Sequence, residues 1–268
     1  TKNHKLIIPK RHVRSFFELG NAEYKGVLEL LKKEFDERGF LIIPDTLSAE
    51  QLESINDSLD RDLESNEWPI LRGNGHKQNA NILLRIPELD ITVENPRLMP
   101  ILTALVPDVS LDEFSTMFRD PTSEIPDRHK WHRDFNRDET YPFGIHAMSL
   151  VYYLSDVTES DHCFALVAAT HNQDIEVKPG EHRLECEVDV IGPAGTAVFF
   201  HTACIHTAKL KPNSRQRRTI HIYYGHVDTA QISNFTDIPD RLRNKRDPSL
   251  PPKFYSKEKT KPDEAASD

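Results

Sequence analysis

The sequence predicts a mostly β protein with flanking helices, built on a double-stranded β-helix (jelly-roll) core with N-terminal helices packed on one sheet. From residue 111 onward, short runs rich in β-branched and aromatic residues alternate with turns at Pro, Gly and Asp. Short strands at this spacing are typical of a sandwich or barrel, and the jelly roll is the natural candidate. Helical periodicity lies mainly before this point, so helices should cover one face of the β core. The expected strands are 112–118, 129–135, 146–154, 163–168, 185–190, 196–200, 203–209 and 217–226.

The first expected helix covers residues 22–38 and is followed by a short strand. Gly39 comes directly after the helix, where a glycine commonly ends one, and the strand at 40–43 stops at Pro44-Asp45. Apolar residues recur along the segment at the spacing of one helix face. They are Tyr24, Val27, Leu28, Leu31 and Phe35.

A second helix is predicted by a capping box, in which Ser48 and Gln51 stand three positions apart. Its apolar face would carry Leu52, Ile55, Leu59 and Leu63.

Residues 66–95 have little regular patterning. The other expected elements are a strand at 81–86, a helix from Asn95-Pro96 to about Leu105, and a helix near 240–245.

The patterning suggests one domain with an extension at each end. Residues 1–20 are basic and uneven and are expected to form an N-terminal arm, and residues 21–228 form the single jelly-roll domain with its helical prelude. Residues 229–254 form a loop-rich C-terminal extension. Residues 255–268 lack core-forming residues and are expected to be disordered.

Composition narrows the classes of function. The net charge of −9 argues against general nucleic-acid binding, which needs an electropositive surface. No apolar run approaches the roughly 20 residues that a membrane helix needs, and the start has no secretory signal pattern. Three cysteines without a Cys-x-x-Cys pair make a disulfide framework unexpected. We therefore expect a cytoplasmic protein, monomeric or homodimeric, whose partner is a small-molecule substrate.

The most informative motif is Lys130-Trp131-His132-Arg133-Asp134-Phe135. On a strand, residues i and i+2 point to the same face, so His132 and Asp134 can reach one point while Trp131 and Arg133 face away. One imidazole and one carboxylate make two thirds of a 2-His-1-carboxylate site, which suits non-haem Fe(II). An exposed strand edge is the alternative reading of this pair.

Candidate partners for this pair lie downstream. The segment 196–206 contains His201 and His206, whose odd spacing puts them on opposite faces if the strand is continuous. The next expected strand opens with Arg217 and Arg218, and an arginine fork can hold a carboxylate bidentately. Arg217 lies eleven residues after His206. Adjacent residues of a strand face opposite ways, so a shift of one residue would exchange the two arginines.

These residues, their order and their spacing resemble the phytanoyl-CoA dioxygenase (PhyH) family of Fe(II)/2-oxoglutarate-dependent oxygenases. The resemblance spans roughly residues 25–227, including Phe35–Pro44 and the Phe-Phe-His strand that leads to His206. It implies the cupin-like jelly-roll fold. It also implies a dioxygenase that hydroxylates an unactivated C–H of a small-molecule metabolite, with succinate and CO2 as coproducts.

The resemblance also implies the site. Fe(II) would be held by His132, Asp134 and His206, and 2-oxoglutarate by Arg217, with Arg218 as its rival. Fe(II), 2-oxoglutarate and O2 would be the cofactors, with ascorbate as a reductant, and no catalytic side chain is expected beyond the metal centre. An iron-bound aspartate favours oxygenation over halogenation, because related halogenases carry a small residue in its place.

Two segments depart from the family pattern. Where the family has Gly-Ser after the distal histidine, this chain has Thr207-Ala208, so the serine hydroxyl that helps to bind 2-oxoglutarate is missing. Where the family has Pro-Gly-Ser-His, this chain has the segment 168–171, Ala-Ala-Thr-His. Neither departure removes a residue of the expected iron site.

The sequence leaves the substrate open. The candidates to line a substrate cavity, which could equally be core residues, are Phe135, Asn136, Arg137, Met148 and Tyr152. His162, His171 and His221 are expected to be structural, and Cys204 a small buried hydrophobe. The alternatives to a dioxygenase are a non-catalytic jelly-roll binding protein and a cupin-like metalloenzyme that does not use 2-oxoglutarate.

Overall fold

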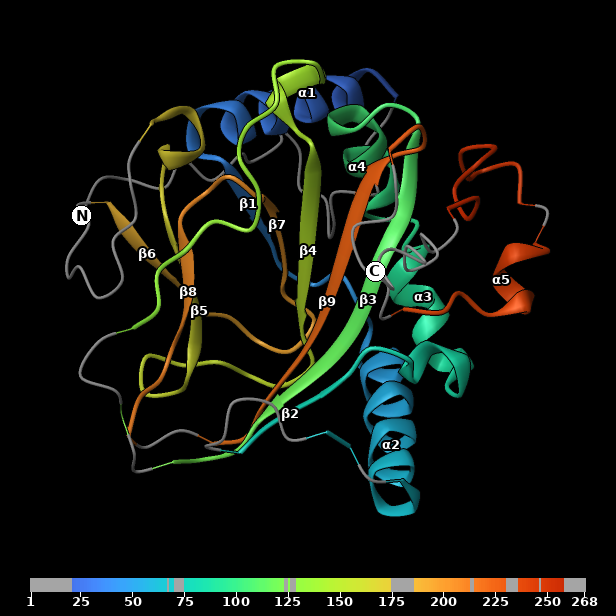
Figure 1. Ribbon diagram of the computed structural model, residues 1–268, viewed down its shortest axis with the longest axis vertical. Helices are drawn as coiled ribbons and strands as arrows, with labels where there is room; N and C mark the ends of the chain where they lie inside the picture. Colours follow the sequence, from blue (N-terminus) through green and yellow to red (C-terminus); the bar gives the residue numbers. More distant parts are fainter. Residues whose placement is uncertain are drawn as a thin grey trace, which may run out of the picture.

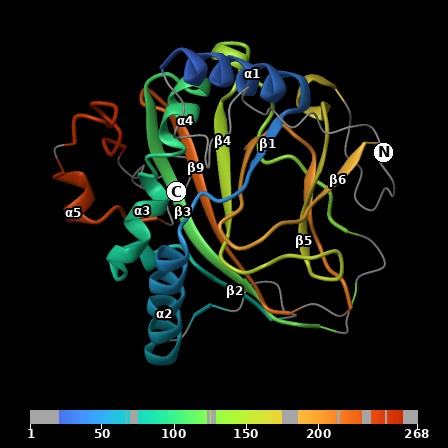
Figure 2. The same ribbon diagram turned by 180° about the vertical axis from the view of Figure 1, so that it is seen from behind.

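The computed structural model of the chain describes residues 21–66, 68–69, 75–122, 125, 129–174, 186–212, 215–229, 236–245 and 247–257. Within these ranges, two antiparallel sheets face each other, and helices cover the outer side of the larger one (Figures 1 and 2). The expected β core with helices on one sheet is therefore confirmed. The expected N-terminal arm, residues 1–20, lies outside the described residues.

The larger sheet has the strand order β1-β7-β4-β9-β3-β2, and the smaller sheet has the order β6-β5-β8. The strands of the larger sheet are β1 (Phe40–Ile43), β2 (His76–Asn79), β3 (Val109–Arg119), β4 (Ala147–Tyr153), β7 (Ala197–His201) and β9 (Arg217–His226). Those of the smaller sheet are β5 (Cys163–Val167), β6 (Glu187–Val190) and β8 (His206–Lys209).

The helices begin and end where local chemistry requires. In α1 (Asn21–Arg38), the chain leaves the helix at Gly39, which has φ +82° and whose missing Cβ leaves room for the His171 ring. The predicted capping box starts α2 (Ala49–Ser65), since Ser48 Oγ accepts from Gln51 N and Ser48 N donates to Gln51 Oε1. The shorter helices are α3 (Asp90–Val93), α4 (Met99–Leu105) and α5 (Asp240–Arg243).

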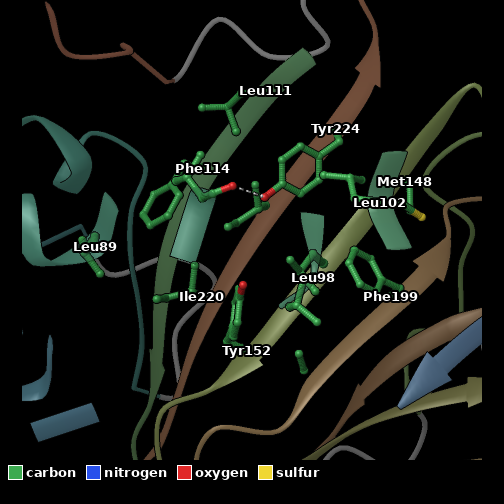
Figure 3. Close-up of a cluster of buried hydrophobic side chains, with 14 of the residues drawn as sticks. Leu89, Leu98, Leu102, Leu111, Phe114, Met148, Tyr152, Phe199, Ile220 and Tyr224 are labelled. Carbon is green, nitrogen blue, oxygen red and sulfur yellow. Dashed lines mark hydrogen bonds between the residues drawn. The ribbon is translucent and has the colours of Figure 1, made fainter. Parts of the chain in front are cut away.

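Alternation along the strands divides the interior into two layers. On β9, Ile220 and Tyr224 pack into the main hydrophobic core between the larger sheet and the helices (Figure 3). Ile222 belongs to the same core. The residues between them face the smaller sheet, where a second apolar cluster holds Phe164 and Phe200. The polar side chains of β9 therefore point into the space between the two sheets.

Three expected elements differ in the structure. Residues 129–135 form no strand, and only His132 makes an isolated bridge, to His206. Residues 81–86 form a 3-10 turn at Ile82–Leu84 instead of a strand, because the buried residues Ile82, Leu83 and Ile86 have helical spacing. The helix expected from Asn95 begins only at Met99, since the Asn95 side chain forms a local turn with Arg97 N. Strand β2 was not expected.

The C-terminal segment is bound to the larger sheet. Phe254 O accepts from Leu111 N (2.8 Å) and from Ser110 Oγ (3.0 Å). Lys257 Nζ donates to Asp112 Oδ2 (2.6 Å) and to Thr229 Oγ1 (2.7 Å). Tyr255 and Lys257 are buried, so the expectation of a disordered tail starting at residue 255 is wrong, because it overlooked an ion pair that a lysine can make inside the fold. Residues 258–268 lie outside the described residues.

No helix in the described part of the chain combines the length and the apolar character needed to span a membrane.

The Lys257–Asp112 pair gives a stability prediction. Lys257→Met should lower the free energy of unfolding by ~3–5 kcal/mol, because it leaves the fully buried Asp112 carboxylate without its cation. Chemical denaturation would measure this loss, with the exposed Lys253→Met as the matched control. The double variant Lys257→Met/Asp112→Asn should recover most of the loss. Equal stability of the Lys257 and Lys253 variants would show that the pair does not hold the C-terminal segment.

Candidate metal centre

His132 and His206 are held together by their own backbones. His132 N donates to His206 O at 3.0 Å, and His206 N donates to His132 O at 2.9 Å. Asp134 N donates instead to Thr202 O, at 3.0 Å, so the segment leaves β8 after a single bridge. This crossing explains why residues 129–135 form no strand although His132 and Asp134 point to one place, as their spacing predicted.

Each imidazole is oriented by a carbonyl two residues before it. His132 Nδ1 lies 2.9 Å from Lys130 O, and His206 Nδ1 lies 2.9 Å from Cys204 O. A carbonyl oxygen only accepts, so Nδ1 carries the proton in both rings and Nε2 presents a lone pair. Both Nε2 atoms lie 3.5 Å from Asp134 Oδ1.

Asp134 is oriented from its other oxygen. Tyr223 OH donates to Asp134 Oδ2 at 2.8 Å, which leaves Oδ1 facing the two histidines. Burial on its own would raise the pKa of this carboxyl, but its polar neighbours, among them the Tyr223 hydroxyl that donates to it, lower the pKa by more, so the group is a carboxylate. One donor atom from each of His132, Asp134 and His206 lies within 4.8 Å of the others. Three lone pairs converging in this way could hold one cation.

The three side chains open into a cavity of about 250 Å³ between the two sheets. Arg217 lines the same cavity and is only 8% exposed. Its Nε and Nη1 have no hydrogen-bond partner among the described residues, and burial lowers the pKa of its guanidinium. A buried cation with unsatisfied donors, beside a cluster of lone pairs, destabilises a folded protein unless a ligand binds to both.

Arg218 faces the opposite side of β9. Its guanidinium pairs with Asp60 (2.7 Å) and lies over the Phe118 ring, 4.6 Å from the centroid. Of the two neighbouring arginines, Arg217 is therefore the one inside the cavity.

The other histidines and Cys204 occupy several environments. His201 is fully buried between Phe35 and His171, and burial lowers its pKa to about 3. His162 and His171 both form hydrogen bonds with backbone groups of neighbouring segments. Cys204 is a buried thiol whose Sγ donates to Val167 O. His221 lines the cavity, where burial is the main reason that its pKa falls to about 3.

The two departures from the family pattern lie next to the cluster. Ala208 lines the cavity, and its neighbour Thr207 turns its hydroxyl away, to Lys130 O. In the segment 168–171, Ala169 adopts a positive φ of 65° and the Thr170 hydroxyl donates to Val167 O. Neither Thr207 nor Ala208 therefore offers a side-chain hydroxyl to a ligand in this cavity.

The residues expected to contact substrate are not brought together. The prediction that Met148 and Tyr152 contact substrate is wrong, because both are fully buried in the core on the helix side of the larger sheet. Phe135 packs on His146, Asn136 is exposed, and Arg137 binds Glu139 and Asn172. None of these three lines the cavity.

Several lining residues were missed. The alternation of side chains along 217–226 predicts that Thr219, His221 and Tyr223 line the cavity, since they share the face of Arg217. Nothing in the pattern pointed to β2. The full lining is His76, Gln78, Met117, Arg119, His132, Asp134, Val151, Phe164, Phe200, His206, Ala208, Arg217, Thr219, His221 and Tyr223.

Solved structures with a similar fold include enzymes of antibiotic biosynthesis. The α-ketoglutarate-dependent carbocyclase SnoK from nogalamycin biosynthesis superposes with a TM-score of 0.63 at 17% identity, covering 88% of this chain and 94% of SnoK. The epimerase SnoN from the same biosynthesis gives 0.62 at 19%, covering 76% and 84%. HygX from Streptomyces hygroscopicus, with nickel and 2-oxoglutarate bound, gives 0.60 at 18%, covering 74% and 86%. At this identity the likeness shows the jelly-roll fold.

A search of curated proteins finds no significant match. A sequence model described as phytanoyl-CoA dioxygenase (PhyH) matches residues 35–219, from the end of α1 into β9. This match covers well over half of the 268 residues. The chain therefore belongs to the phytanoyl-CoA dioxygenase family.

Proposed function

We propose that this protein is an Fe(II)/2-oxoglutarate-dependent dioxygenase that hydroxylates an unactivated C–H of a small molecule. The observation that carries the proposal is the meeting, in one cavity, of a three-donor cluster and a buried arginine with unsatisfied donors. A binding protein that had lost its metal would have no reason to keep both features, since each is destabilising without a ligand.

The donor set fits ferrous iron. His132, Asp134 and His206 would supply two neutral imidazoles and one carboxylate, the facial set that leaves positions open on non-haem Fe(II). The hydrogen bonds of the two Nδ1 atoms and of Asp134 Oδ2 would fix these donors before the metal arrives. HygX and SnoN have been solved with iron bound, which supports the choice of metal.

The cavity fits a dicarboxylate cosubstrate beside the metal. Arg217 would pair with the distal carboxylate of 2-oxoglutarate, while the other end of the molecule lies at the metal. Structures of HygX and SnoN with 2-oxoglutarate (α-ketoglutarate) support this choice. The need for a carboxylate partner at Arg217 also argues against a cupin-like metalloenzyme without this cosubstrate.

Iron and 2-oxoglutarate, once bound, would supply the oxidising chemistry, and the protein's own residues position and enclose the reactants. Phe164, Phe200 and Val151 line the cavity with apolar surface that excludes water. Asp134 occupies the position that a small residue holds in related halogenases, so oxygen transfer is the proposed outcome. SnoN and SnoK are an epimerase and a carbocyclase, so the analysis of products must look for those outcomes as well.

The first test is an anaerobic titration with Fe(II) and 2-oxoglutarate. We expect a weak charge-transfer band in the visible when both are present. The band should be absent in His206→Ala, which loses a donor, and strongly weakened in Arg217→Ala, and a chelator should abolish it. If the wild-type protein binds no iron, the dioxygenase proposal fails and the jelly-roll binding protein is favoured. If iron binds without a band, the 2-oxoglutarate part fails.

The Tyr223 hydroxyl gives a second prediction. Tyr223→Phe should weaken Fe(II) binding by ~10–100-fold, because the hydroxyl holds the Asp134 carboxylate in its orientation. The control is Tyr224→Phe, whose hydroxyl donates to Val93 O on the core side and should leave the affinity for iron unchanged. Competition with a chelator of known affinity measures both. Equal affinities in the two variants would contradict the role given to Tyr223.

The buried arginine gives a third prediction, about stability. Arg217→Met should raise the melting temperature of the ligand-free protein, because it removes a buried cation two of whose nitrogens lack a partner among the described residues. Arg218→Met should lower it, because that arginine is paired with Asp60 and stacked on Phe118. Calorimetry of both variants without ligand tests the contrast in sign. A loss of stability in Arg217→Met as large as that in Arg218→Met would contradict it.

A further inference from the structure

A second arginine lies directly beside Arg217. In the pairing of β3 with β9, Arg119 is opposite Arg217, and in the pairing of β2 with β3, His76 is opposite Arg119. Directly opposite residues of antiparallel strands project from the same face, with Cβ atoms about 4.5–5.5 Å apart. All three line the cavity. We call His76, Arg119 and Arg217 the basic row.

The basic row brings the guanidinium groups of Arg119 and Arg217 to the same part of the cavity wall. Like charges directly opposite on adjacent strands destabilise a sheet, and Arg217 has two nitrogens without partners among the described residues. The effect reaches His162, whose pKa falls to about 4, first because the ring is buried and then because of Arg217 and Arg119. An anion that contacts both guanidinium groups would be stabilised by charge-assisted hydrogen bonds from each of them.

The basic row lies at the end of the cavity that is far from the three-donor cluster. Tyr223 binds Asp134 at one end of the β9 face, and Arg217 begins the strand at the other, with Thr219 and His221 between them. A metal-bound ligand that extends along the cavity toward the start of β9 would meet both arginines with its other end. For 2-oxoglutarate, that end is the distal carboxylate.

Among the described residues of β8, the side chain that lines the cavity after His206 is that of Ala208, which has no hydrogen-bond donor. Ala208 is two residues beyond His206 on β8 and shares its face, and it stands where the family has the serine that helps to bind 2-oxoglutarate. A carboxylate has about four lone-pair sites, enough for bidentate bonds from two arginines. Arg119 is placed to fill the sites that a serine on β8 would otherwise occupy.

We propose that Arg119 is a cosubstrate-binding residue, which together with Arg217 holds the distal carboxylate of 2-oxoglutarate and takes the place of the missing serine hydroxyl. The assignment rests on the proposed function, since it needs 2-oxoglutarate in this cavity. Two guanidinium groups around one carboxylate leave an excess positive charge. The protein should therefore discriminate strongly against 2-oxo acids without a distal carboxylate.

The test is an anaerobic titration of the Fe(II)-loaded protein with 2-oxoglutarate and with 2-oxopentanoate, followed by the visible charge-transfer band. 2-Oxopentanoate has the same number of carbons but no distal carboxylate. Arg119→Gln should weaken 2-oxoglutarate binding by about tenfold or more, the value of a hydrogen bond to a charged group. It should change the affinity for 2-oxopentanoate by less than about twofold. Arg119→Lys, which keeps the charge and loses the fork, should weaken only 2-oxoglutarate, and by less.

The matched control is Arg218→Gln, which removes the same charge from the other face of β9 and should leave both affinities unchanged. An Arg119→Gln variant that binds 2-oxoglutarate as the wild type does would overturn the assignment and leave the proposed function intact. An equal loss for both acids would also overturn it, because it would mark Arg119 as a structural residue. If the wild type shows no band with 2-oxoglutarate, the proposed function fails, and the assignment fails with it. If Arg119→Gln does not fold, the same comparison in Arg119→Lys decides.

Discussion

The site depends on the reciprocal backbone hydrogen bonds between His132 and His206. They join a segment that has no other strand pairing to the end of β8, and they place two imidazoles from distant parts of the sequence side by side. Each ring is then held in one tautomer, because its Nδ1–H donates to the carbonyl of Lys130 or of Cys204. Because every one of these contacts uses the backbone, the geometry of the cluster needs few specific side chains besides the donors and Tyr223. This explains how a short motif can specify the centre.

Strand β9 links this centre to the stability of the whole domain. Its side chains alternate between the apolar core, as with Ile220 and Tyr224, and the cavity, as with Arg217 and Tyr223. The core side supplies the favourable burial that keeps the sheet together, and it offsets the cost of the buried, unsatisfied polar groups on the other side. The sheet can therefore present a strained, positively charged face without losing its structure, which is the usual relation between a rigid scaffold and a binding site.

The sequence predicted this arrangement where a local period was enough. The bounds of β9, the capping box of α2 and the convergence of His132 and Asp134 all follow from spacing within one segment. Tyr152 shows where spacing fails. It pairs with Ile220 on β9 and so faces the core, whereas its neighbours Val151 and Tyr153 face the other sheet. Both faces of β4 are buried, so its pattern has no polar side from which the register could be chosen. The basic row depends on the pairing of three strands, which no single segment encodes.

The metal cluster and the cavity wall come from different parts of the fold. The cluster is local to β8 and the crossing segment, but the cavity wall also takes His76 and Gln78 from β2 and Met117 and Arg119 from β3. Among the described strands, β2 is at the edge of the sheet, next to β3. The bridge and the Nδ1 hydrogen bonds of the two rings are made within residues 130–132 and 204–206, so a change of side chain on β2 leaves these contacts in place. Proteins of this fold at 17–19% identity include an epimerase and a carbocyclase. The fold therefore fixes the three donors through the backbone around β8, and it leaves the side chains that β2 adds to the cavity wall free to differ.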